Sequence, residues 1–140
     1  AACAARRLPF YAALNVTGRE RFWPPHRADA LVARGFRRDQ RRDKGFGGVA
    51  LGPTAPTVMA AAFAAHGYTV LRAPSDWNID RRARLFTQEI ATGHGTAALA
   101  WERRGAAAIE DWIAARRAQA ADGLLSVRIG HQDLLALPPG

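Results

Sequence analysis

The sequence predicts an α/β fold in which helices cover a narrow sheet, and three observations support this prediction. A continuous apolar run from Leu8 to Val16 is typical of a strand that is buried on both faces. Several later stretches place apolar residues at three- and four-residue spacing, as amphipathic helices do. Two further strand-like runs, Tyr68–Ala73 and Leu124–Leu137, alternate with these helical stretches, and that alternation is typical of α/β sheets.

The first strand is followed by turn residues at Thr17–Glu20. Arg21–Trp23 can then pair back as a short edge strand, which Pro24-Pro25 ends because proline has no N–H to donate. A strand of interior character needs a neighbour on each side, and three main strands do not supply both for Leu8–Val16. With Ala rather than Met as the first residue, this predicts a fragment whose sheet continues upstream.

Two helices are predicted between the first and second main strands. Arg27–Asp43 has an apolar face flanked by arginines, and the glycine-rich stretch Gly45–Gly48 ends it. Thr54 is placed to cap the next helix, which ends at Gly67. The apolar face of the first of these helices consists of Leu31, Val32, Gly35 and Phe36.

Two or more helices are predicted between the second and third main strands. A helical pattern begins at Asp80, and Gly93–Gly95 is expected to break it and to leave His94 exposed in a loop. Ala106–Ala121 forms a further helix whose inward residues are Ile109, Trp112 and Ile113. The last strand then runs from Leu124 to Leu137, with a bend expected at Gly130.

Composition indicates one globular domain but does not identify its partner. The chain has 140 residues and a formal net charge of +8, carried largely by scattered arginine pairs. Such a balance keeps a basic RNA-binding or adaptor module without catalysis as an alternative function. Cys3 is the sole cysteine, which excludes an internal disulfide and fits a reducing, cytoplasmic location. No apolar run approaches the roughly 20 residues of a membrane span.

Four segments in fixed order resemble the C-terminal half of a bacterial class I S-adenosylmethionine-dependent methyltransferase. They read YAALNVTG…FWPPH, DQRRDKGFGGVALGP, GY…SDW and VRIGHQDLLALP, and the resemblance extends from about Leu8 to Pro139. It implies a Rossmann-like sheet in which Leu8–Val16 is strand five and Tyr68–Ala73 is strand six. Leu124–Leu137 would be strand seven, antiparallel to both and lying between them, with helices covering the sheet.

The resemblance also implies an activity. Residues 1–140 would be the C-terminal portion of a single methyltransferase domain, inactive alone, with the cofactor-binding portion absent and expected upstream of Ala1. The full-length enzyme would transfer a methyl group from S-adenosyl-L-methionine to an acceptor, which we expect to be a small molecule rather than a nucleic acid. The catalytic residues are left open, and the family's glycine-rich turn after its first strand is not found here.

Two polar stretches are candidate substrate-binding sites. In the first, Arg41, Lys44 and Phe46 surround a glycine loop that can clamp an anionic group, or can act only as a helix stop and lid. In the second, Asp76 can accept a hydrogen bond from substrate and Trp77 can stack on it, at the end of a strand. The alternative there is a helix cap and a core tryptophan.

One further pair has catalytic potential. His131 and Asp133 lie two apart on the last strand and therefore share a face, as a base and its orienting carboxylate require. The alternative is a structural histidine. The histidines are dispersed and have no neighbours at ligand spacing, so we expect no metal site.

Overall fold

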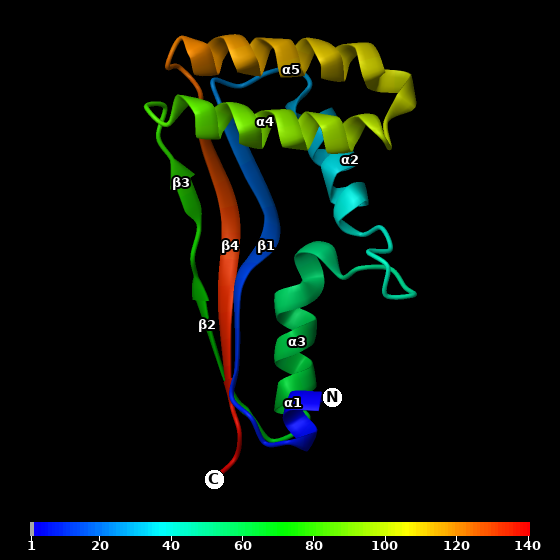
Figure 1. The fold of residues 1–140 in the computed structure, drawn as a ribbon, viewed down its shortest axis with the longest axis vertical. Coiled ribbons are helices and arrows are strands. Elements are labelled where there is room, and N and C mark those ends of the chain that lie inside the picture. The colour runs from blue at the N-terminus through cyan, green and yellow to red at the C-terminus, as the bar shows by residue number, and fades with distance from the viewer. Residues whose placement is uncertain (1) are drawn as a thin grey trace.

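The structure, a computed structural model, describes residues 2–140 as an α/β fold. The strands are β1 (Phe10–Trp23), β2 (Thr69–Pro74), β3 (Trp77–Ile79) and β4 (Ser126–Leu137). The helices and 3-10 turns are α1 (Ala2–Ala5), α2 (Asp29–Gln40), η1 (Gly52–Thr54), α3 (Ala55–Ala64), α4 (Arg84–Leu99), η2 (Arg103–Gly105) and α5 (Ala106–Ala121). Figure 1 shows an elongated molecule, with α3 beside the lower half of the sheet and α4 and α5 across its upper end.

The central strand of the sheet is β4, the last in the chain. It pairs with β1 on one side and with β2 and then β3 on the other, and every pairing is antiparallel. The strands β1, β2 and β3 therefore all run in the same direction. The predicted position of the last strand, between the other two and antiparallel to both, is confirmed.

The strand β1 runs without interruption from Phe10 to Trp23, so the predicted turn at Thr17–Glu20 and the separate edge strand are wrong. Its register against β4 shifts twice, and Gly18 adopts a φ of 73° in the second irregular stretch. There Gly130 of β4 lies so close to β1 that a Cβ would be 3.1 Å from the Arg19 carbonyl oxygen. Glycines on both strands let β1 bulge without ending. The strand β1 therefore stays paired with β4 from Phe10 to Trp23.

A small core holds α3 against the lower half of the sheet. Tyr68, Leu134 and Ala136 are buried there, and the rings of Phe10 and Phe63 stack with centroids 4.9 Å apart. The helix begins after Thr54 as predicted, although its side chain makes no capping bond: the hydroxyl donates to the Leu51 carbonyl at 2.8 Å.

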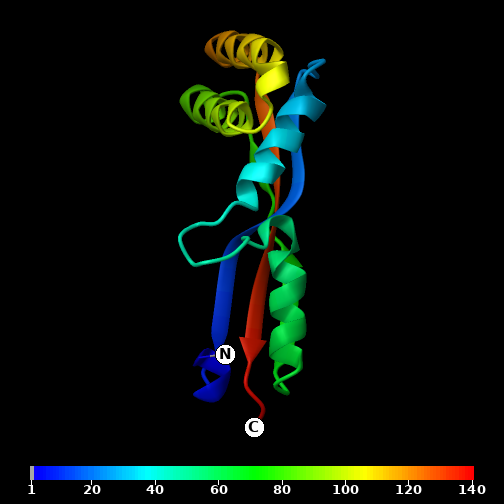
Figure 2. The ribbon, with the colours of Figure 1, turned by 90° about the vertical axis from the view of Figure 1, so that its right-hand side faces the viewer.

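The helices α2, α4 and α5 gather at the upper end of the sheet (Figures 1 and 2). A larger hydrophobic core is buried between these helices and the strands. The predicted inward residues Ile109 and Trp112 are fully buried in it, and Ile113 is half-buried. The indole of Trp112 packs edge-on against Phe22 of β1, with ring centroids 5.0 Å apart. This core fixes the end of β1 to α5.

The predicted break at Gly93–Gly95 is wrong, because α4 continues through it to Leu99. Gly95 packs directly against Ile113, where a Cβ would collide, and Gly35 of α2 approaches Ala98 in the same way. A glycine in a helix costs about 1 kcal/mol relative to alanine, and the close packing of three helices offsets that. His94 is consequently buried in α4 and not exposed in a loop.

The opposite face of the lower sheet carries no helix among residues 2–140 (Figure 1). Tyr11, Leu135 and Leu71 form a row across β1, β4 and β2 on this face. Tyr11 is 61 % exposed and Leu71 is 54 % exposed. The outer edge of β1 has no strand partner within the described chain either.

Candidate functional site

The polar residues with the densest contacts gather where β2 ends and β1 bulges, midway along β4. In open α/β sheets, ligands bind beyond the carboxyl ends of parallel strands. The strands β1 and β2 run in the same direction, and Ser75 and Asp76 follow the end of β2. The site is therefore where a ligand of such a sheet is expected.

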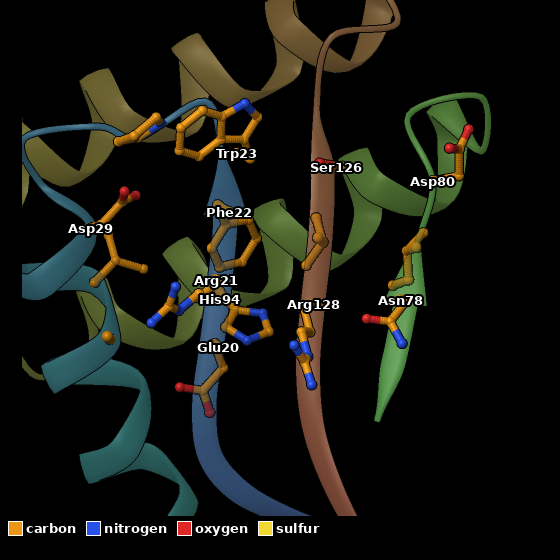
Figure 3. A pocket seen from close by; sticks show the side chains of 15 residues that line it. Glu20, Arg21, Phe22, Trp23, Asp29, Asn78, Asp80, His94, Ser126 and Arg128 are labelled. Carbon is orange, nitrogen blue, oxygen red and sulfur yellow. The ribbon is translucent and has the colours of Figure 1, made fainter. Parts of the chain in front are cut away.

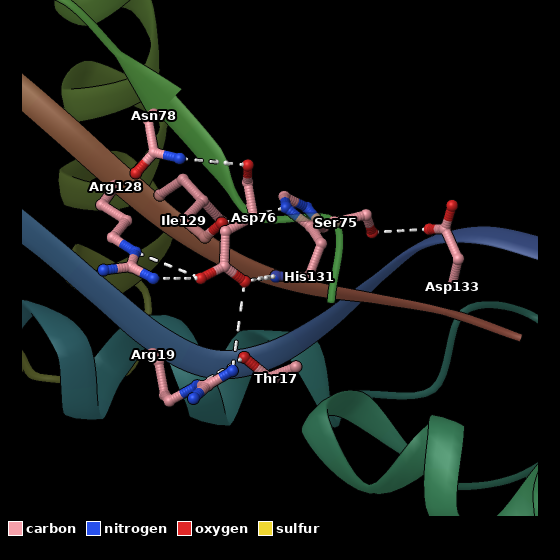
Figure 4. A network of polar contacts seen from close by, with 9 residues as sticks. All are labelled: Thr17, Arg19, Ser75, Asp76, Asn78, Arg128, Ile129, His131 and Asp133. Atoms are coloured by element: carbon pink, nitrogen blue, oxygen red, sulfur yellow. Dashed lines mark hydrogen bonds and ion pairs between the residues drawn. The ribbon is translucent and has the colours of Figure 1, made fainter. Parts of the chain in front are cut away.

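Asp76 organises one half of this site (Figure 4). Its Oδ2 accepts hydrogen bonds from Nε and Nη2 of Arg128 at 3.1 and 2.7 Å, and Oδ1 accepts one from the backbone N–H of His131 at 3.0 Å. The guanidinium of Arg19 lies 4.0 Å from Oδ1. The Arg128 bonds are the main reason that the pKa of Asp76 lies below its usual value. The helix-capping alternative for Asp76 is wrong.

Asp133 organises the other half. Its carboxylate accepts hydrogen bonds from the hydroxyls of Ser75 and Tyr11, each at 2.6 Å. These bonds lower the pKa of Asp133, and the bond to Asp133 raises the pKa of Tyr11. His131 instead places Nδ1 3.1 Å from the Ile129 carbonyl oxygen, so no hydrogen bond joins it to Asp133 and the predicted catalytic pair is not formed.

Trp77 belongs to β3 and not to a loop. Its ring is half-buried against the upper core and lies 4.9 Å from the ring of His131 and 5.8 Å from that of Phe86. The core interpretation of Trp77 therefore describes its position better than the stacking interpretation.

The glycine loop lies elsewhere, on the side of α2 and α3 away from β3 (Figure 1). Asp43 shapes it by accepting the N–H groups of Gly45 and Phe46 at 2.8 and 3.1 Å. Lys44 donates to the Asp39 carbonyl at 3.1 Å, and the Phe46 ring is 94 % exposed. No hydrogen bond or ion pair in residues 2–140 joins Arg41, Lys44 or Phe46 to Asp76.

A cavity of about 570 Å³ lies beside the upper ends of β1 and β4 (Figure 3). Glu20, Phe22 and His94 are among its lining residues. The His94 Nδ1 lies 2.8 Å from the Ile90 carbonyl oxygen, which requires the proton on Nδ1 and leaves Nε2 as a lone-pair acceptor. Burial lowers the pKa of His94 to about 4, so the ring is neutral at neutral pH.

Glu20 is the least satisfied ionisable group in the described chain. Both of its carboxylate oxygens are buried without a hydrogen-bond partner. Burial raises the pKa of Glu20, and the positive charge of Arg37 offsets only part of that rise. A carboxyl whose pKa is raised on folding stabilises the fold at pH values below its ordinary pKa, and this contribution is lost as pH rises through the raised value.

We expect Glu20→Gln to stabilise the protein at pH 7 by about 1 kcal/mol, a low value for relieving a buried charge because part of the side chain meets solvent. The gain over wild type should shrink as pH falls through the raised folded pKa of Glu20 and should be smallest below 4.5, the ordinary Glu value. Urea unfolding at several pH values measures this. Glu89→Gln, an exposed change on α4, is the control and should leave stability unchanged. An unchanged midpoint for Glu20→Gln at pH 7 contradicts the assignment.

Sequence reasoning missed Glu20, Arg19, Arg128 and the burial of His94. For Glu20 and Arg19 the sequence contained a signal, because successive side chains of β1 point to opposite faces of the sheet. Glu20 and Phe22 face the helices, while Arg19, Arg21 and Trp23 face the other way. Arg128 joins them only through the register of β1 against β4, which the sequence does not specify.

Comparison with known proteins adds no identification. No family model, no curated protein and no solved structure matches this chain. Within residues 2–140, no helix combines the length and apolar character needed to cross a bilayer, and no three potential metal-ligating side chains come together. The structure defines the class as α/β, with a small open sheet built around β4.

Proposed function

We propose that this chain is the acceptor-side, C-terminal half of an S-adenosylmethionine-dependent methyltransferase domain. The observation that carries the proposal is the position of β4, which runs antiparallel between β1 and β2. The resemblance noted in the sequence implies this order for strands five, seven and six. The polar site beyond the end of β2 and beside the bulge of β1 would then face the acceptor.

The outer edge of β1 supports the proposal. Phe10–Val16 contains no charged residue and no proline, the devices that protect exposed edges from pairing. The strand β2 is short and ends at Pro74, as a true edge does. The exposed row of Tyr11 and Leu71 likewise suits a sheet that is covered on both faces. We propose that further parallel strands follow outward from β1.

The glycine loop lacks the features of a cofactor cradle. The loop at Gly45, Gly47 and Gly48 follows a helix, and a Cβ added to any of these glycines meets nothing within 4 Å. It is therefore no cradle, and we assign cofactor binding to the strands beyond β1. Methyl transfer depends mainly on holding the acceptor in position, and positioning is the role that we propose for the residues described here.

Isothermal titration calorimetry of the intact, gene-encoded protein with S-adenosylmethionine tests this function. We expect saturable binding at one site, and transfer of label from methyl-labelled cofactor to a small-molecule acceptor. Absence of cofactor binding by the intact protein overturns the proposal.

An RNA-binding or adaptor role has less support. The alternative relied on net charge and arginine pairs, but several arginines of the predicted helix Arg27–Asp43 are paired with acids. Arg34 and Arg38 both bind Glu102 at 2.9 Å, and Arg42 binds Asp39 at 3.0 Å. Filter binding to RNA across a range of salt concentration separates the two functions. A steep salt dependence without any response to cofactor favours the RNA-binding module.

A further inference from the structure

Three arginines share the face of the upper sheet that is turned away from α2, α4 and α5: Arg19 and Arg21 of β1 and Arg128 of β4. Phe22 and Glu20 point to the helices, so alternation places Arg19 and Arg21 on the other face. Arg21 and Arg128 are direct partners in the register of β1 against β4. We refer to these three residues as the arginine cluster.

The cluster carries more positive charge than the protein around it neutralises. Like charges directly opposite each other on neighbouring strands destabilise a sheet. Asp76 is the carboxylate in contact with the cluster: it binds Arg128 and lies 4.0 Å from Arg19. The guanidinium of Arg21 has no hydrogen bond or ion pair in the described part of the chain. Three guanidinium groups against one carboxylate leave a local charge of two positive units.

These groups enclose a space for a ligand. A cavity of about 250 Å³ is lined by Arg19, Arg21, Asp76 and Arg128. Asp76 fixes Arg128 through Nε and Nη2, and the Nη1 of Arg128 makes no hydrogen bond within residues 2–140. Arg19 is held through Nε by the Thr17 hydroxyl at 3.2 Å. The remaining N–H groups, with those of Arg21, form planar donor sets that match the oxygens of a phosphate.

We infer that the arginine cluster binds the phosphate group of a small-molecule phosphate monoester. A monoester near neutral pH carries between one and two negative charges, which matches the local excess better than a carboxylate does. The cluster lies just beyond the carboxyl end of β2 and beside the C-terminal half of β1, in the region where a ligand of this sheet is expected. The role of this monoester as the methyl acceptor rests on the proposed function, whereas its binding does not.

Calorimetric titration of the intact protein with phenyl phosphate, at fixed ionic strength and without cofactor, tests the inference. We expect saturable binding by wild type and none of the matched neutral probe, phenol. Arg21→Gln should weaken binding at least about tenfold, the loss of one charge-assisted contact. Arg103→Gln, which removes an exposed arginine on η2, should change the dissociation constant less than about twofold, because it alters only screened, long-range charge.

Three results overturn the inference: no saturable binding of phenyl phosphate, equal binding of phenol, or equal weakening by Arg21→Gln and Arg103→Gln. A fourth result would also overturn the inference: single-stranded RNA binds and Arg21→Gln weakens that binding, while phenyl phosphate does not bind. The ligand of the arginine cluster would then be a nucleic acid and not a small monoester. These measurements also separate failure of the phosphate site from failure of the proposed methyltransferase function. Phenyl phosphate binding without S-adenosylmethionine binding removes the methyltransferase and keeps the site, and the reverse result removes the site alone.

Discussion

Trp112→Ala should destabilise the protein by about 3–5 kcal/mol, the range for removing a large aromatic side chain from a core. Trp112 is fully buried between β1 and α4, and its Nε1 donates to Asp29 at 2.6 Å. Its ring also contacts Phe22 and faces the Arg116 guanidinium at 5.2 Å. A domain of this size has about 5–15 kcal/mol of stability in total, so the variant should be close to unfolding. Urea unfolding followed by circular dichroism measures the loss.

Trp101→Ala is the matched control, because the Trp101 ring is 42 % exposed and its Nε1 lies 3.4 Å from Asp39. It should cost about 1 kcal/mol or less. Similar losses for the two variants would mean that the core under α4 and α5 is not packed as described.

Arg116→Met should lower the free energy of unfolding by about 3 kcal/mol, the lower end of the range for breaking a buried ion pair. Arg116 is fully buried, and it donates to the Pro24 carbonyl at 2.5 Å, to Asp29 at 2.6 Å and to Gln119 at 2.7 Å. Asp29 retains about a third of its exposure and keeps bonds from Trp112 and the His26 N–H, which moderates the loss. Arg116 holds the Pro24 carbonyl, just beyond the end of β1. The variant should therefore also loosen the wall of the cavity lined by Glu20, Phe22 and His94.

A double-mutant cycle identifies the cause. Adding Asp29→Asn to Arg116→Met should cost less than the sum of the two single changes, because the pair acts as a unit. Arg117→Met, an exposed neighbour on α5, should stay within about 0.5 kcal/mol of wild type. Strict additivity in the cycle would contradict a direct ion pair. Both predictions concern the upper core, which holds the end of β1 beside the candidate site.

Local pattern predicted the strands and helices whose burial is simple. Tyr68–Ala73 and Leu124–Leu137 correspond closely to β2 and β4, and Ala106–Ala121 matches α5 at both ends. Continuous apolar runs and helical periodicity are local signals, and here tertiary packing reinforces them. The placement of β4 between β1 and β2 was predicted from the resemblance to methyltransferases. The order of strands and helices along the sequence is compatible with that placement.

Two errors have one physical origin. The turn expected at Thr17–Glu20 and the break expected at Gly93–Gly95 both relied on glycine as a local signal for chain reversal or helix ending. In the structure Gly18 and Gly95 have other uses: Gly18, opposite Gly130 of β4, allows β1 to bulge, and Gly95 lets α4 meet Ile113. Local propensity does not distinguish these uses, because the neighbour that comes close is distant in the sequence.

The candidate site was predicted only in part. Asp76 was chosen for its position after a strand, and it does lie at the centre of a polar network. Arg41, Lys44 and Phe46 were chosen for glycine-loop chemistry, but the loop packs with α2 and contacts Asp39. Arg21 and Arg128 are far apart in the chain and meet through strand register, so no motif could have joined them.

The central claim is that the sheet continues outward from β1. Hydrogen exchange on the intact, gene-encoded protein tests it at the amides of Phe10–Val16 that do not bond to β4. The account predicts that these amides are protected as strongly as those of β4, because a further strand pairs with them. Exchange as fast as in the exposed loop at Asp43–Val49 would show that β1 is a free edge and would contradict the account.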